Sequence, residues 1–196
     1  MPGLLRWFVA LAVWPALVLP GYVLVERYAS TPGRLAEPPT TWPAASGLTR
    51  TPGRFAIVVL AHPRCPCTRA TLAELARLVS AIDGRADVWV LFLDPAGADW
   101  SRTDLWTQAT SIPGVQVLAD RAGEVADLLH AYTSGQVVVY DPAGALVFNG
   151  GITPGRGHQG SNEGRSDIAA SILGETPASS TTPVFGCALH NPESAR

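Results

Sequence analysis

The feature that most constrains this chain is a pair of cysteines, Cys65-Pro66-Cys67, between a strand-like and a helix-like pattern. Residues 55–61 form an uninterrupted apolar run rich in β-branched side chains, which is typical of a strand buried on both faces. After the pair, apolar residues recur at helical spacing, at Leu72, Leu75, Ala76, Val79 and Ile82. The sequence therefore predicts that both thiols lie where a buried strand ends and a helix begins.

A thiol in this position is expected to ionise readily. Proline is favoured in the first turn of a helix, and the unpaired N–H groups and the dipole there stabilise a thiolate. Arg64 and Arg69 flank the pair and act in the same direction. A thiolate is the form that attacks disulfides and binds soft metals. Because Cys65 precedes the helix, we expect it to be the most exposed of the thiols and the nucleophile.

The beginning of the chain predicts a membrane anchor. Residues 7–25 carry no charge, and a helix over them is roughly 28 Å long, close to the thickness of bilayer hydrocarbon. A cleaved signal peptide has a shorter apolar core that ends at a small-x-small site, whereas Glu26 and Arg27 follow this run. We therefore expect residues 1–27 to be an uncleaved, single-pass anchor in the cell membrane.

Arginines lie on both sides of the apolar run, so the positive-inside rule does not orient it. We expect the globular part to lie outside the cytoplasm, because a short N-terminal anchor resembles an export signal. A reactive cysteine pair is also useful in an oxidising compartment.

Composition excludes several function classes. The chain contains no lysine, which excludes Schiff-base chemistry, a Walker lysine and a lysine base. The arginines are spread along a chain of net charge −2, so no basic stripe for nucleic acid is present. The acidic residues form no paired arrangement typical of a glycosidase or of a metal–carboxylate site.

Beyond the anchor, three segments differ in composition. Residues 28–52 are rich in Pro, Ser, Thr and Gly and predict a semi-extended linker. Residues 53–174 have the length of one domain with one core. Residues 175–196 form a tail that carries Cys187. Its first part, residues 176–183, is expected to be flexible, and the apolar residues 184–189 are expected to fold back onto the domain.

Within the predicted domain, strand and helix patterns alternate and end in a hairpin and a helix. The predicted strands are residues 55–61, 87–94, 115–118, 136–140 and 145–148. The predicted helices follow Cys67 as far as residue 82 and then cover residues 101–112, with Asp99 or Ser101 as the cap, 122–132 and 166–173. This order implies an α/β fold in which a mixed sheet has helices on both faces.

The layout resembles the thioredoxin-like superfamily over most of residues 55–151. A cysteine pair at the start of the helix after a central strand is the active-site position of that superfamily. Residues 117–126 and 137–147 are similar to the later half of its membrane-anchored, TlpA- and peroxiredoxin-like branch. Three motifs together are most similar to RedB-type thioredoxin-like proteins: His62-Pro63-Arg64-Cys65-Pro66-Cys67, Gly150-Gly151-Ile152 and Thr182-Pro183-Val184-Phe185-Gly186-Cys187.

Two departures from the superfamily affect what the resemblance implies. One residue rather than two separates the cysteines, so that Arg64 takes the first cysteine's place if Cys67 takes the second's. The superfamily's cis-proline, which lies beside the disulfide, corresponds to Gly135, directly after Ser134. We expect these two residues to contact substrate, since glycine lets a partner's backbone approach.

The resemblance implies thiol–disulfide exchange with a protein or a small thiol, with no cofactor other than a redox-active disulfide. A Cys65–Cys67 disulfide would close a tight, strained and easily reduced ring. Cys65 is the predicted nucleophile, Cys67 is the first candidate for the resolving thiol and Cys187 is the second, with His62 and Arg64 tuning the thiolate. Alternatively, Cys187 forms a structural bridge between the tail and the domain, and the domain is a silent scaffold.

A metal carrier is a further alternative. The spacings His62-x-x-Cys65-x-Cys67 and Cys187-x-x-His190 offer two to four soft ligands, which suit zinc or Cu(I). Residues 155–160 match the G-x-G-x-x-G motif of a dinucleotide-binding loop. They follow the last predicted strand instead of the first strand of a βαβ unit, so dinucleotide binding is excluded. We interpret these residues as a polar loop that either lines the thiol site or is a mobile insert.

Overall fold

A computed structural model describes residues 2–95 and 103–189. The chain divides into two compact units, one ending at Thr31 and the other beginning at Pro32. The first unit is a single helix, α1 (Pro2–Ser30), on which apolar side chains such as Trp14, Leu17 and Leu24 are exposed. Among the helices of the described residues, none combines the length and the hydropathy that a membrane span requires. The predicted membrane anchor therefore stays a prediction.

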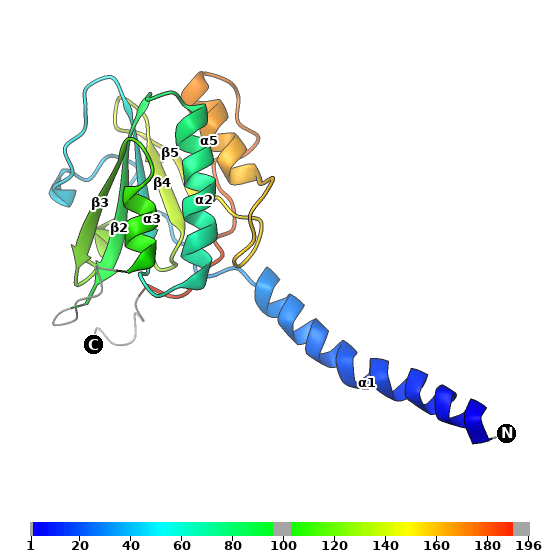
Figure 1. Cartoon of the computed structure of the whole chain (residues 1–196). Helices are drawn as coiled ribbons and strands as arrows, with labels where there is room; N and C mark the ends of the chain where they lie inside the picture. Colours follow the sequence, from blue (N-terminus) through cyan, green and yellow to red (C-terminus); the bar gives the residue numbers. More distant parts are fainter. Residues whose placement is uncertain (1, 96–102, 190–196) are drawn as a thin grey trace. The chain divides into compact units, whose positions relative to one another are not determined.

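The second unit is built on a five-stranded sheet with the strand order β3-β2-β1-β4-β5 (Figure 1). The strands β1 (Phe55–Ala61), β2 (Ala86–Asp94) and β3 (Val115–Arg121) run parallel to one another. The strands β4 (Gln136–Tyr140) and β5 (Leu146–Gly151) form a hairpin, in which β4 pairs antiparallel with β1. The sheet is therefore mixed, as the sequence predicts, and β1 lies at its centre.

Both faces of β1 are buried, which explains its uninterrupted apolar run. Alternate side chains point to opposite faces of a strand. Ile57 and Val59 belong to the core on one face, and Val58 and Leu60 belong to a second core on the other. Two cores thus hold β1 in place and fix the point at which the chain leaves the sheet toward Cys65.

Helices cover both faces of the sheet. The helices α2 (Pro66–Ala81), α3 (Asp104–Thr110) and α5 (Glu163–Leu173) pack on one face (Figure 1). The short helix α4 (Glu124–Leu128) contributes to the core on the other face. Three parallel strands followed by an antiparallel hairpin, with the cysteine pair between the central strand and α2, are consistent with a thioredoxin-like fold. This confirms the predicted α/β class.

Two predicted helices are longer than the observed ones. The helix predicted at residues 101–112 is α3, which begins after Thr103, whose hydroxyl accepts the backbone N–H of Trp106. The predicted caps Asp99 and Ser101 lie outside the described residues. The helix predicted at residues 122–132 is α4 and ends at Leu128, because His130 turns the chain with a φ of 51°.

The stretch predicted to be a linker packs along the domain. Trp42 lies against two core aromatics, with ring centroids 6.0 Å from Trp89 and 5.3 Å from Tyr140. The Tyr140 hydroxyl donates to the Pro39 carbonyl over 2.9 Å. A turn of 3₁₀-helix (Ala44–Ser46) follows Trp42. Residues 32–52 thereby close the core on the α4 side of the sheet.

We expect Trp42→Ala to lower the free energy of unfolding of the second unit by about 2 kcal/mol. The change removes a large aromatic side chain from a partly buried site and leaves a cavity against the core. Chemical denaturation of the full chain measures this loss. The matched control is Trp7→Ala, because Trp7 is an exposed residue of α1. A loss below about 0.5 kcal/mol for Trp42→Ala, in the range of surface substitutions, would show that this contact is dispensable.

Candidate functional site

Cys65 is the N-cap residue of α2. A tight turn connects it to β1, since its backbone N–H donates to the carbonyl of His62 over 3.1 Å. Its own carbonyl accepts the N–H of Thr68 over 3.0 Å, and Pro66 occupies the first turn of the helix. The predicted position of the thiols at a helix start is confirmed.

The environment of the Cys65 sulfur favours the thiolate. Burial raises the pKa of this thiol, but hydrogen bonds from the Cys187 thiol and from the backbone N–H groups of Cys187, Cys67 and Thr68 outweigh that effect. The N–H of Cys187 lies 3.4 Å from the Cys65 sulfur. The net result is a pKa below the usual value of a cysteine.

The other two thiols are shifted in the opposite direction. Burial raises the pKa of Cys67, and the negative charge and hydrogen bonding of Cys65 raise it further. The same causes raise the pKa of Cys187 to about 12. The positive charge of Arg156 partly offsets both shifts. Cys65 is therefore the thiol of the three that ionises most easily.

The expectation that Cys65 is the most exposed thiol is wrong. Its exposed fraction is 0% and that of Cys67 is 8%, whereas Cys187 is only partly buried. The physical reason is the C-terminal segment, residues 182–189, which folds back over the start of α2 and which we call the cover segment. The prediction that residues 184–189 return to the domain is thereby confirmed, and it is this return that buries Cys65.

The loop before β4 holds the cover segment. The N–H of Ser134 donates to the carbonyl of Cys187 over 2.8 Å, and Thr133 forms an antiparallel bridge with Ala188. Gly135, at the place expected for a cis-proline, has a φ of 90°, and no peptide bond of the described residues is cis. Ser134 and Gly135, predicted to contact substrate, thus lie at the thiol site beside a segment of the same chain, and their contact with a substrate stays a prediction.

Ser134 also ties this loop to the cysteine turn. Its hydroxyl accepts the backbone N–H of His62 over 2.9 Å and lies 3.0 Å from the hydroxyl of Thr68. The N–H of Gly135 donates to the carbonyl of Leu60 at the end of β1 over 2.7 Å. The turn before α2 and the loop before β4 are therefore joined by hydrogen bonds next to the thiol site.

His62 supports the turn that carries Cys65. Its ring Nδ1 accepts the backbone N–H of Arg64 over 3.1 Å, and its carbonyl accepts the hydroxyl of Thr68 over 3.2 Å. Burial lowers the pKa of His62, and the charge of Arg64 lowers it further. Arg69, by contrast, pairs with the exposed Asp104.

Arg156 belongs to the polar loop predicted at residues 155–160, but the sequence assigns it no specific role. It lies in the loop between β5 and α5, donates to the carbonyl of Gly186 and lowers the pKa of Cys67 and Cys187 by its charge. The neighbouring N–H of Gly157 also lowers the pKa of Cys67. Of the two interpretations of residues 155–160, the structure therefore supports a loop that lines the thiol site.

A buried carboxylate on α2 anchors this loop. Glu74 is completely buried, and its oxygens accept the backbone N–H of Gly160 over 2.8 Å and the side-chain amide of Asn162 over 3.3 Å. Arg165 and Arg77 pair with the same carboxylate. Because α2 begins directly after Cys65, Glu74 ties the loop that carries Arg156 to the helix that carries the thiols.

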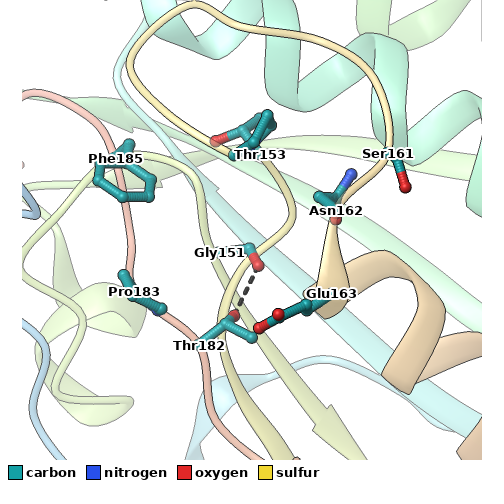
Figure 2. Close-up of a pocket in the computed structure, with 10 residues that line it drawn as sticks. Gly151, Thr153, Ser161, Asn162, Glu163, Thr182, Pro183 and Phe185 are labelled. Carbon is teal, nitrogen blue, oxygen red and sulfur yellow. Dashed lines mark hydrogen bonds between the residues drawn. The ribbon is translucent and has the colours of Figure 1, made fainter. Parts of the chain in front are cut away.

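Glycines seat the cover segment against β5 and the loop before β4. A Cβ atom at Gly151 would crowd the carbonyl of Pro183, and one at Gly186 would overlap the carbonyl oxygen of Ser134. The Thr182 hydroxyl donates to the Gly151 carbonyl over 2.7 Å (Figure 2). The motif glycines of the sequence thus mark where two backbones approach closely.

A pocket of about 310 Å³ lies beside the cover segment (Figure 2). Thr182, Pro183 and Phe185 of the cover segment form one part of its wall, and Asn162 and Glu163 at the start of α5 form another.

The described residues do not form a set of metal ligands that would support the metal-carrier alternative. In the part of the chain that the structure describes, no group of three or more His, Cys, Asp and Glu residues has the geometry to hold a metal ion. His190 lies outside the described residues. Binding of zinc or Cu(I) stays a prediction.

Comparisons with known proteins place the fold. No family model matches the chain, and no curated protein matches it. An uncharacterized conserved protein from Geobacillus kaustophilus is similar in structure, with 17% identity, a TM-score of 0.59 and coverage of 83% of this chain and 94% of that chain. A hypothetical protein from Sinorhizobium meliloti 1021 has 20% identity, a TM-score of 0.58 and coverage of 81% and 93%.

A third solved structure is a secreted Mycobacterium tuberculosis disulfide oxidoreductase homologous to E. coli DsbE. It has 14% identity and a TM-score of 0.46, and the match covers 63% of this chain and 83% of that one. Similarity at these identities concerns the fold alone.

We expect the alkylation rate of Cys65 to level off at a lower pH than the rates of Cys67 and Cys187. Only the thiolate reacts, so a lowered pKa moves the midpoint of the rate profile to lower pH and a raised pKa moves it to higher pH. Iodoacetamide labelling of the reduced protein is read by peptide mass spectrometry between about pH 5 and pH 10, a range that brackets the usual value. The rate of Cys65 should level off within this range, while the rate of Cys187 should still rise at its upper end. The denatured chain is the control, in which the three midpoints should converge. A lowest midpoint at Cys67 would contradict the assignment.

Proposed function

We propose that this protein carries out thiol–disulfide exchange with Cys65 as its nucleophile. The observation that supports the proposal is the hydrogen bonding of the Cys65 sulfur, which receives three backbone N–H groups and the Cys187 thiol at the start of α2. These donors lower the pKa of a fully buried thiol, an arrangement that structural cysteines do not need.

The reaction requires two thiols of the protein. The Cys65 thiolate attacks one sulfur of a substrate disulfide and releases the other as a thiolate, which takes up a proton. A second thiol of the protein then loses its proton and attacks the Cys65 sulfur, releasing the remaining substrate thiolate and closing a protein disulfide. The substrate gains two electrons and the protein loses two. The reverse sequence oxidises a dithiol partner.

Several neighbours have defined roles in this proposal. His62 shapes the turn that presents Cys65, and its pKa is lowered by burial and then by the charge of Arg64. Arg156 favours the thiolate of the resolving cysteine, because its charge lowers the pKa of both candidates, Cys67 and Cys187. The partner is a protein or a small thiol, and the closer relationship to the membrane-anchored, RedB-type branch belongs to the same proposal.

We expect Cys65→Ser to abolish exchange with oxidised glutathione. A hydroxyl at this position cannot replace a thiolate, so the rate should fall by more than about tenfold. The matched variant Cys67→Ser/Cys187→Ser keeps only Cys65 and should accumulate a mixed disulfide with glutathione, detected by intact mass. Exchange that survives Cys65→Ser, or a double variant that forms no mixed disulfide, would exclude Cys65 as the nucleophile.

We also propose that α1 attaches the protein to the cell membrane, with the domain outside the cytoplasm. The support is the uncharged run of residues 7–25 and the exposure of apolar side chains such as Leu17 and Leu24. The domain should be degraded by protease added to spheroplasts, be protected in intact cells with an outer envelope, and sediment with membranes after a carbonate wash. A domain that survives in spheroplasts would overturn the orientation, and release by carbonate would overturn the anchor.

A further inference from the structure

We propose that Cys187, rather than Cys67, closes the disulfide with Cys65, and that the cover segment must leave its seat before Cys65 can react with another molecule. This inference rests on the proposed exchange function. It assigns to the C-terminal segment two tasks, the resolving thiol and the closure of the site.

The cover segment is bound in the manner of an added strand. The N–H of Ser134 donates to the carbonyl of Cys187 over 2.8 Å, and the N–H of Leu189 donates to the carbonyl of Tyr132 over 2.9 Å. Nearer the start of the cover segment, the N–H of Gly33 donates to the carbonyl of Val184 over 2.8 Å. The backbone bonds on both sides of Cys187 fix its register, so that this cysteine faces Cys65.

Buried side chains and close backbone contacts also hold the cover segment against the domain. Val184 and Leu189 are buried, and Leu189 belongs to the core on the α4 side of the sheet. Gly186 lies so close to the carbonyl of Ser134 that a Cβ atom would not fit. Arg156 donates to the carbonyl of the same glycine. These contacts are made by the chain's own segment at the place where the partner of Cys65 has to lie.

The local backbone favours Cys187 over Cys67 for a disulfide with Cys65. Both cysteines place a thiol and an N–H at the Cys65 sulfur, but Cys187 lies outside any helix, so that a bond to it breaks no helical turn. Cys67 lies inside the first turn of α2, which is held by the bond from the Thr68 N–H to the Cys65 carbonyl. A Cys65–Cys67 bond would close a strained ring around Pro66 and distort that turn.

The burial of Cys65 makes movement of the cover segment a required step. With an exposed fraction of 0%, the sulfur is out of reach of a substrate disulfide while the segment is seated. When the segment leaves, the Cys65 thiolate attacks the substrate disulfide and one substrate thiolate departs. When it returns, the Cys187 thiol gives up its proton and attacks Cys65, so that the second substrate thiolate departs and the Cys65–Cys187 disulfide closes.

Disulfide mapping of the full chain tests the pairing. The protein is equilibrated with oxidised glutathione, the free thiols are alkylated and the peptides are identified by mass spectrometry. We expect a Cys65–Cys187 linkage with Cys67 alkylated. A Cys65–Cys67 linkage would overturn this inference and leave the exchange function intact. A chain that forms no disulfide at any glutathione ratio would overturn both.

Displacement of the cover segment tests the closure. In Gly186→Ala, the new methyl group collides with the Ser134 carbonyl, so Cys65 of the reduced protein should be alkylated at least about tenfold faster than in the wild type, as expected when a buried thiol becomes accessible. Leu189→Ala is a milder variant with an expected increase in the same direction.

Gly144→Ala is the matched control, because its methyl group would crowd Arg50 and Trp42 at the turn between β4 and β5, at the opposite end of this hairpin from Gly151 and the cover segment. If this variant accelerates the alkylation of Cys65 as much as Gly186→Ala does, general loosening of the domain explains the effect and the closure is overturned. Unchanged alkylation of Cys65 in both Gly186→Ala and Leu189→Ala would also overturn it.

Discussion

The site depends on the balance between desolvation and hydrogen bonding at one sulfur atom. Removing a thiolate from water is unfavourable, and a buried cysteine without donors stays protonated. Cys65 is fully buried, yet its pKa is lowered because N–H groups from the first turn of α2 and from the cover segment point at its sulfur. The cover segment excludes water from the Cys65 sulfur and supplies, through the thiol and the N–H of Cys187, two of the hydrogen-bond donors that replace that water.

This balance requires parts of the chain that are distant in sequence to meet. The turn after β1 supplies Cys65, the loop before β4 supplies the backbone that binds the cover segment, and the loop between β5 and α5 supplies Arg156. Glu74, a buried carboxylate of α2, accepts the Gly160 N–H of that last loop and pairs with Arg165 of α5, and losing these partners would be costly because a buried charge would be left unpaired. The thiol cluster is therefore a property of the whole domain.

Much of the fold follows from local patterns in the sequence. The alternating strands, the helix after Cys67 and the hairpin at residues 136–151 are all visible in periodicity and turn residues, and the position of Cys65 at a helix start follows from them. The burial of Cys65 does not, because it is caused by a hydrogen-bonded segment 122 residues farther along the chain. Arg156 was likewise hidden in a polar loop, since no local pattern shows that Glu74 draws this loop toward the thiols.

The separation of Cys65 from Cys187 has a consequence for biosynthesis. Cys65 and Cys67 leave the ribosome first, and the 122 residues that separate Cys65 from Cys187 take on the order of ten seconds to make at 5–20 residues per second. During that interval Cys65 and Cys67 have only each other as thiol neighbours, so an oxidising compartment would favour a bond between them before Cys187, the proposed partner, exists. Under the proposed pairing, maturation in such a compartment requires a thiol that reopens this early bond.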